Sequence, residues 1–122
     1  MKRDVVRFNI GLRAIAGLSP VSFYFNGLGG NPDDGRQQLG LIAQDVEKVA
    51  PQLVGTLAVK LHSSDSKPTT VKTVNYAALT YALINAVKEL KAANDNYAAQ
   101  LATLRSQVAE LQRRAGVRTA AR

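Results

Sequence analysis

The sequence predicts an α+β fold, in which a small globular part with short helices and a few β-strands precedes a long C-terminal helix that forms a parallel coiled coil. In the last third of the chain, apolar residues recur at alternating steps of four and three, which is coiled-coil spacing. Before it, short alternating segments are separated by glycine- and proline-rich stretches, which is typical of strands and turns. We therefore divide the chain into an α+β domain at 1–78, an oligomerisation helix at 79–115 and a flexible basic tail at 116–122.

The first 51 residues predict two short helices around one strand. Residues 5–17 have apolar side chains at roughly helical spacing and end at a glycine, which indicates a short helix or a turn-rich segment. Residues 20–25 alternate β-branched and aromatic residues, which indicates a half-buried strand. After a glycine-rich loop at 26–35, Ile42, Val46 and Val49 share one face of a helix that Pro51 ends.

Two further strands and the long helix complete the expected fold. Residues 53–61 and 71–76 are rich in β-branched and apolar residues, and the polar segment 62–70 between them reads as a loop or hairpin tip. From residue 77 the chain is expected to be helical until Gly116, because no earlier residue breaks the helix.

The coiled-coil seam predicts self-association, because a lone helix would leave this stripe in water. Its members are Leu83, Val87, Leu90, Asn94, Tyr97, Leu101, Leu104, Val108 and Leu111, with Ala115 continuing the series. Asn94 is a polar residue at a core position, a device that sets register at a cost in stability. The flanking positions contain no acid but several alanines, which favours a parallel trimer, although the core residues alone also allow a dimer. The alternative is an amphipathic helix that packs on its own domain.

Composition argues against several classes of function. The net charge of +7 raises the question of nucleic acid, but the basic residues form two loose groups at the chain ends with no aromatic platform between them, so nucleic-acid binding is not expected. With no cysteine and one histidine, His62, we expect no metal site and no cofactor. No apolar run reaches the roughly 20 residues of a membrane span or suits a secretion signal. The chain is therefore expected to stay inside the cell that makes it.

Three blocks of the sequence, at 9–25, 39–54 and 74–90, resemble the endosialidase-type intramolecular chaperone domain of bacteriophage tail spikes and tail fibres. The most specific block is Gly-Leu-Ile-Ala-Gln-Asp-Val-Glu with a following Pro-Gln-Leu-Val. The signature residues are Gly40, Leu41, Ile42, Ala43, Gln44, Asp45, Val46, Pro51, Leu53, Val54, Asn75 and Tyr76. Asn75 stands where the family usually has aspartate.

The resemblance implies a trimeric folding clamp that holds three fibre chains in register and is then released by self-cleavage with a serine nucleophile and a lysine base. Aligned on Asn9 and Ile10, these two family positions fall on Lys2 and Arg7. Arginine stays protonated and cannot act as the base. We therefore expect no catalytic residues and no cleavage. Met1 would then reflect a translational start, and an N-terminus altered from the natural one is the alternative.

The leading hypothesis is a non-enzymatic trimerisation and assembly chaperone, whose partners are copies of itself and phage tail-fibre or tail-spike chains. It would act in the host cytoplasm during phage assembly. A self-cleaving serine peptidase-chaperone and a structural adaptor retained in the mature tail are the alternatives. The polar loops at 26–35 and 62–70 are the expected contacts with the fibre, unless they are disordered.

Overall fold

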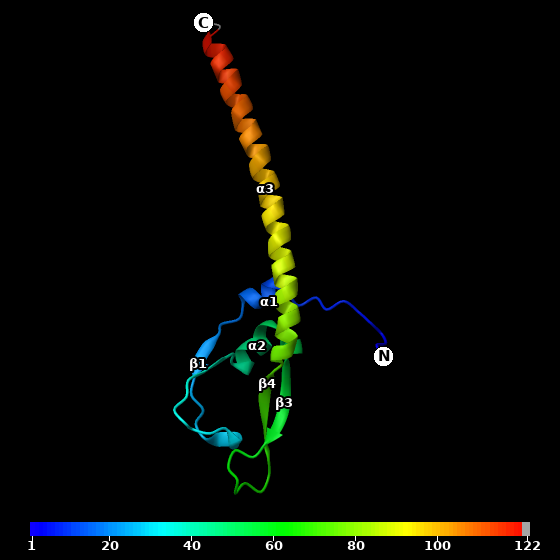
Figure 1. The fold of residues 1–122 in the computed structure, drawn as a ribbon, viewed down its shortest axis with the longest axis vertical. Helices are drawn as coiled ribbons and strands as arrows, with labels where there is room; N and C mark the ends of the chain where they lie inside the picture. The colour runs from blue at the N-terminus through cyan, green and yellow to red at the C-terminus, as the bar shows by residue number, and fades with distance from the viewer. Residues whose placement is uncertain (121–122) are drawn as a thin grey trace. The chain divides into compact units, whose positions relative to one another are not determined.

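The computed structural model describes residues 1–120, with side chains through residue 116, and the chain divides into two compact units. The N-terminal unit, Met1–Ala86, contains all the short elements and the first turns of the long helix. The second unit begins at Val87 and continues that helix. The predicted α+β class is confirmed, with short helices and two small antiparallel sheets before the helix (Figure 1).

The first helix, α1, is shorter than predicted and covers only Leu12–Ala16. Val5 and Val6 lie outside it and are 79% and 86% exposed, so the helical spacing of the early apolar residues was misleading. Gly17 ends α1, and its N–H donates to the carbonyl of Ala14. A Cβ at Gly17 would lie 2.9 Å from Val49 Cγ1, so glycine permits the close approach of α1 to the next helix.

The first sheet pairs the predicted strand β1, Val21–Phe23, with β2, Gln38–Gly40, a strand that was not predicted. The strands are antiparallel, with Val21 opposite Gly40. β2 has three residues and its central side chain, Leu39, is 83% exposed, so it has no apolar alternation to detect. The loop between the strands contains the 3₁₀ turn η1, Leu28–Gly30.

Helix α2, Ala43–Val49, forms where predicted but buries a different face. Ala43, Val46 and Ala50 are buried, whereas Ile42 and Val49 are 42% and 40% exposed. Ile42 stands before the first helical residue in an extended conformation, so it does not share the face of Val46. The prediction that Ile42, Val46 and Val49 share one face of this helix was therefore wrong, because Ile42 lies outside it. The 3₁₀ turn η2, Pro51–Leu53, follows, as expected of proline at a helix end.

The two later strands form an antiparallel hairpin, as predicted, with shifted ends. β3 covers Val54–Val59 and β4 covers Thr69–Val74, and Val54 lies opposite Val74. β4 thus begins two residues before its predicted start and ends before Tyr76. An ion pair of 2.7 Å between Lys72 Nζ and Glu47 Oε1 connects β4 to α2.

Helix α3, Tyr76–Ala120, begins one residue before its predicted start and continues past Gly116. The side chain of Asn75 caps it, because Asn75 Oδ1 accepts the N–H of Ala78 at 3.1 Å. The predicted basic tail at 116–122 falls mostly outside the described side chains, and residues 121–122 lie outside the described part of the chain.

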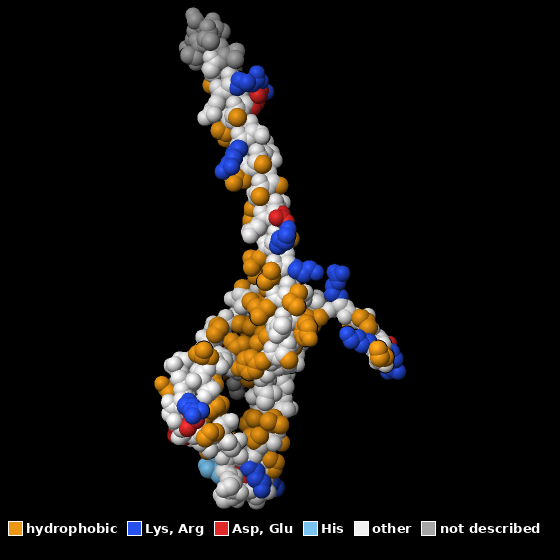
Figure 2. All heavy atoms as spheres, in the orientation of Figure 1, with side chains coloured by type: hydrophobic (Ala, Val, Ile, Leu, Met, Phe, Trp, Pro, Cys, Tyr) orange, Lys and Arg blue, Asp and Glu red, His pale blue; other side chains and the backbone are white. Residues whose placement is uncertain are grey.

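The core of the N-terminal unit is small. Val46, Ala50 and Leu53 form its buried centre, and partly buried side chains from α1, β4 and α3 pack around them. The partly buried members are Ile10, Ala14, Leu18, Leu41, Val54, Val74, Ala78 and Leu79. Many large apolar side chains stay exposed, both on this unit and along the rest of α3 (Figure 2). Small domains bury a modest share of their surface, so contacts with other chains can add much stability.

Replacement of Gly40 by alanine should destabilise the N-terminal unit. An added Cβ would lie 2.7 Å from Tyr76 Oη and 3.2 Å from Phe23 Cε1. We expect Gly40→Ala to lower the free energy of unfolding by about 1–3 kcal/mol, the usual cost of overpacking. Urea denaturation at one fixed protein concentration measures the change. The control is Gly116→Ala, where nothing lies within 4 Å and alanine should favour the helix by up to about 1 kcal/mol. Equal stability of Gly40→Ala and the unmodified chain would contradict this account of Gly40.

Candidate oligomer interface

The seam side chains form an exposed apolar stripe on α3. The eight large apolar members are between 48% and 64% exposed: Leu83, Val87, Leu90, Tyr97, Leu101, Leu104, Val108 and Leu111. Asn94 and Ala115 are exposed as well. Only Leu83 belongs to the N-terminal unit, and the others lie on the helical unit. Half-exposed leucines repeated at heptad spacing are typical of a helix that packs against other helices.

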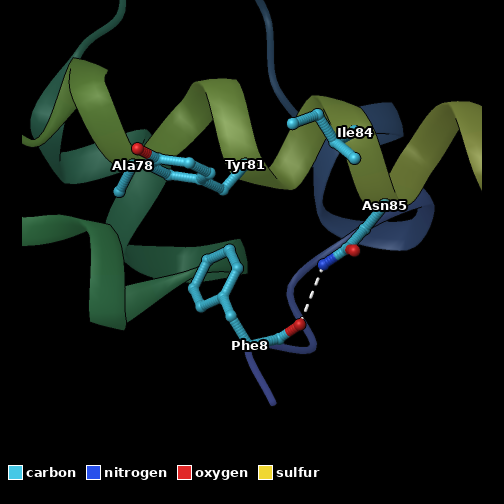
Figure 3. A pocket seen from close by; sticks show the side chains of 5 residues that line it. All are labelled: Phe8, Ala78, Tyr81, Ile84 and Asn85. Atoms are coloured by element: carbon cyan, nitrogen blue, oxygen red, sulfur yellow. Dashed lines mark hydrogen bonds between the residues drawn. The ribbon is translucent and has the colours of Figure 1, made fainter. Parts of the chain in front are cut away.

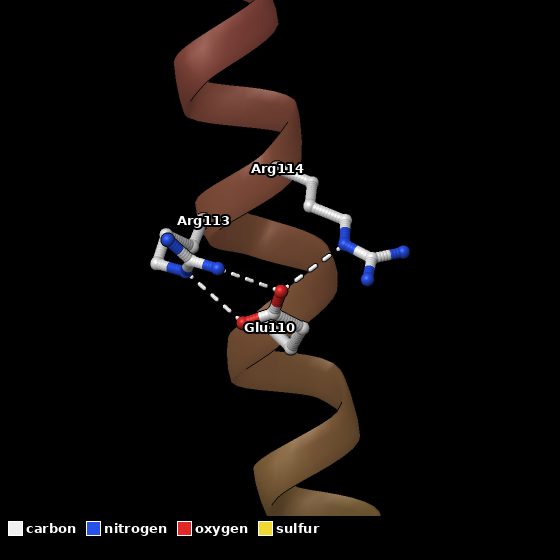
Figure 4. A network of polar contacts seen from close by, with 3 residues as sticks. All are labelled: Glu110, Arg113 and Arg114. Atoms are coloured by element: carbon white, nitrogen blue, oxygen red, sulfur yellow. Dashed lines mark hydrogen bonds and ion pairs between the residues drawn. The ribbon is translucent and has the colours of Figure 1, made fainter.

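Five charged side chains of the helical unit pair within their own helix. Lys91 Nζ lies 2.6 Å from Asp95 Oδ2. Glu110 accepts hydrogen bonds from Arg113 at 2.7 and 3.0 Å and from Arg114 at 3.1 Å (Figure 4). The hydrogen bonds from Arg113, and secondly from Arg114, hold the pKa of the Glu110 carboxyl below its ordinary value. Asp95 and Glu110 occupy neither the core positions of the seam nor the positions that flank it. No acidic side chain therefore borders the apolar stripe on the helical unit.

The signature residues of the resemblance form the joint between the first sheet and α3. The hydroxyl of Tyr76 accepts the N–H of Leu41 at 2.9 Å, directly after Gly40. The backbone N–H of Asn75 donates to the carbonyl of Leu53 at 2.7 Å. Gly40 ends β2, and Val54 begins β3. Of the other members, Ala43 to Val46 belong to α2, and Pro51 and Leu53 belong to η2. These signature residues therefore support the fold.

The two family positions for catalysis lie on the exposed N-terminal segment. Lys2 and Arg7 are both exposed, and no helix or strand holds them. Further along the segment, Asn85 of α3 donates from Nδ2 to the carbonyl of Phe8 at 2.9 Å (Figure 3). It also donates to the carbonyl of Ile10 at 2.9 Å. Asn85 was missed from the sequence, because its bonds join residues 75 and 77 positions apart and no local pattern marks them.

The two polar loops lie beside each other, which the sequence did not indicate. The N–H of Gly29 in η1 donates to the carbonyl of Leu61 at 3.0 Å. Each loop also has a local turn, in which Asn26 accepts from the N–H of Leu28 and Asp65 accepts from the N–H of His62. Between the loops is a cleft of about 730 Å³. Its lining is Gly27, Gly29, Gly30, Val59, Lys60, Leu61, His62, Ser63 and Ser64.

The described residues contain no group of three or more histidine, cysteine, aspartate or glutamate side chains that could hold a metal ion. Within the same part of the chain, no helix is both long and apolar enough to cross a membrane.

Removal of the Asn85 donor should release the N-terminal segment. Asn85→Asp keeps the size of the side chain but replaces the amide donor with a carboxylate that faces two carbonyls. We expect about 1–3 kcal/mol of destabilisation and faster amide exchange at residues 8–11, measured by hydrogen–deuterium exchange. Asn96→Asp, at an exposed position of α3, is the matched control. Unchanged exchange at residues 8–11 would show that Asn85 does not hold this segment.

The ion pairs of Glu110 predict a pH dependence at the end of the described helix. The pKa of Glu110 is lowered. The stability that its ion pairs give to the helix end is therefore fully present above the ordinary carboxyl pKa, and it is lost as the pH falls through the lowered pKa. Amide exchange at residues 108–116 should therefore accelerate in acid, relative to its intrinsic rate. Glu110→Gln should remove this acceleration, whereas the same pH profile in both proteins would rule out Glu110 as its source.

Residues 1–55 match the family described as the chaperone of endosialidase. The match contains the first two of the three resembling blocks and ends just after the Pro-Gln-Leu-Val sequence. No curated protein matches the chain. The resemblance to an endosialidase-type chaperone domain is thereby confirmed.

Proposed function

We propose that this endosialidase-type chaperone domain is a non-enzymatic trimerisation domain that holds three phage tail-fibre or tail-spike chains in register during assembly. One observation carries the proposal, which is the half-exposed apolar seam that continues along α3 beyond Val87. The family match at residues 1–55 supports the chaperone role.

Association would remove the seam from water. Each large seam side chain is about half exposed in the single chain, so its burial contributes on the order of 1 kcal/mol. The free energy gained by burying eight such side chains per copy exceeds the free-energy cost of association only if the helices align along the whole seam. Asn94 favours one alignment, because three amides at one level can bond to one another whereas a shifted register buries them against leucine.

The proposed function does not include self-cleavage. Arg7 stands at the position of the family's lysine base, and arginine does not release its proton at physiological pH. Lys2 stands at the position of the serine nucleophile. The coil would therefore remain attached to whatever it aligns, as in an adaptor retained in the tail. Detection of the intact domain in purified particles would favour the retained adaptor over a discarded chaperone.

The paired polar loops are the proposed contact with the fibre. The bond between Gly29 and Leu61 places the two loops at one site, and the cleft between them presents Lys60, His62 and two serines. Polar side chains on loops held by a scaffold are a common form of partner surface.

A charge in the seam should abolish the oligomer. Leu104→Asp, and equally Leu101→Asp, would place one carboxylate from each copy in the buried core of the coil, where charge is strongly disfavoured. We expect only monomer at micromolar concentration, measured by size-exclusion chromatography with light scattering.

The matched control is Ala99→Asp, which introduces the same charge on the exposed outer face of the helix and should leave the oligomer intact. If the unmodified chain were a monomer, or if Leu104→Asp and Leu101→Asp kept its mass, the seam would not be the association surface.

A further inference from the structure

The first turns of α3 are covered on one flank and bare on the other. On the covered flank, Ala82 and Ala86 are 0% and 3% exposed, and Leu79 packs against the core of the same chain. On the opposite flank, Tyr81 is 61% and Ile84 is 51% exposed. The buried core of the N-terminal unit therefore packs on one side of the helix, whereas the N-terminal segment at Phe8 approaches the other side.

The bare flank is one wall of an apolar groove of about 310 Å³. Phe8, from the N-terminal segment, is the other wall, and Tyr81 and Ile84 face it across the groove with Ala78 and Asn85 (Figure 3). The hydrogen bond from Asn85 to the carbonyl of Phe8 holds this wall in place. None of the five lining residues carries a charge, so the groove suits an apolar protein surface.

The heptad indicates which surface lies opposite the groove. With Leu83 at the core position d, Leu79 and Ala86 fall at g and Ile84 falls at e. In a parallel coiled coil with cyclic symmetry, the g side of each helix lies beside the e side of the next. The buried core of the N-terminal unit packs on the g side of its own helix. It must therefore lie beside the e side of the neighbouring helix, where Ile84 and the groove are exposed.

We propose that the groove lined by Phe8, Tyr81 and Ile84 is covered by the N-terminal unit of the neighbouring copy. This inference rests on the proposed parallel oligomer and adds a second surface to it. Each copy then covers the groove of the next around a closed ring. Because Asn85 binds both Phe8 and Ile10, the same contact fixes the path of each N-terminal segment along the first turns of α3.

Hydroxyl-radical footprinting with mass spectrometry tests the proposal on the full chain. The oxidation rates of Phe8, Tyr81 and Ile84 are compared between the unmodified oligomer and monomeric Leu104→Asp, whose substitution lies on the other unit. We expect about threefold or greater protection in the oligomer, as follows when half-exposed side chains become buried. Leu53, 1% exposed, should stay unreactive in both proteins, which shows that the N-terminal unit is folded.

A second comparison needs no monomeric variant. Ile84→Ser should raise the protomer concentration at half dissociation by about tenfold or more, because each copy loses one buried side chain. Leu39→Ser is the matched control, since Leu39 is 83% exposed on β2 and does not line the groove. It should change that concentration by less than about twofold, since surface substitutions rarely matter. If Leu53 became reactive in Leu104→Asp, the N-terminal unit of that variant would be unfolded. The comparison of Ile84→Ser with Leu39→Ser would then decide by itself whether the groove is covered.

The outcomes separate this inference from the proposed function. A monomeric unmodified chain would overturn the proposed function. An oligomer with an unprotected groove, or with equal effects of Ile84→Ser and Leu39→Ser, would overturn only the inference about the groove. Protection that appears only when a fibre chain is fused before Met1 would assign the groove to the fibre and would also overturn the inference.

Discussion

The constraint on which the rest of the structure depends is that this chain has more apolar surface than it can bury by itself. The buried centre of the N-terminal unit is Val46, Ala50 and Leu53, whereas the seam of α3 leaves leucine after leucine about half exposed. A core of this size supports little stability alone. The proposed association with copies of the same chain would resolve both problems, because it would cover the seam and, through the groove at Ile84, would reinforce the small domain.

The joint at the start of α3 attaches the first turn of the helix to the small domain. Asn75 caps the helix and also bonds to Leu53, and Tyr76 bonds to the backbone of Leu41. These contacts join η2, the end of the first sheet and α3 at one place. These signature residues therefore form hydrogen bonds to backbone groups and pack closely. Gly40 is required because the hydroxyl of Tyr76 lies too near for a side chain.

The parts of the fold with strong local patterns could be predicted from the sequence. The heptad identified α3, and the β-branched segments on either side of the polar stretch at 62–70 identified the hairpin, because each pattern repeats over many residues. β2 could not be predicted, since three residues with an exposed Leu39 have no periodicity. The face of α2 was misjudged because Ile42 precedes the helix, a boundary that spacing alone does not mark.

The candidate interface likewise has one part that the sequence predicts and other parts that it does not. The seam follows from spacing within one segment and was visible in the sequence. The groove requires Phe8 and Tyr81 to meet across more than 70 positions, and the pairing of Gly29 with Leu61 requires two separate loops to meet. Such long-range contacts depend on tertiary packing, which no local pattern encodes.

Sedimentation equilibrium of the intact chain tests the central claim most directly. The chain has a mass of 13.1 kDa, and the account predicts a single species of three times that mass at micromolar concentration, which dissociates only on dilution. A species at 13.1 kDa throughout that range would contradict it.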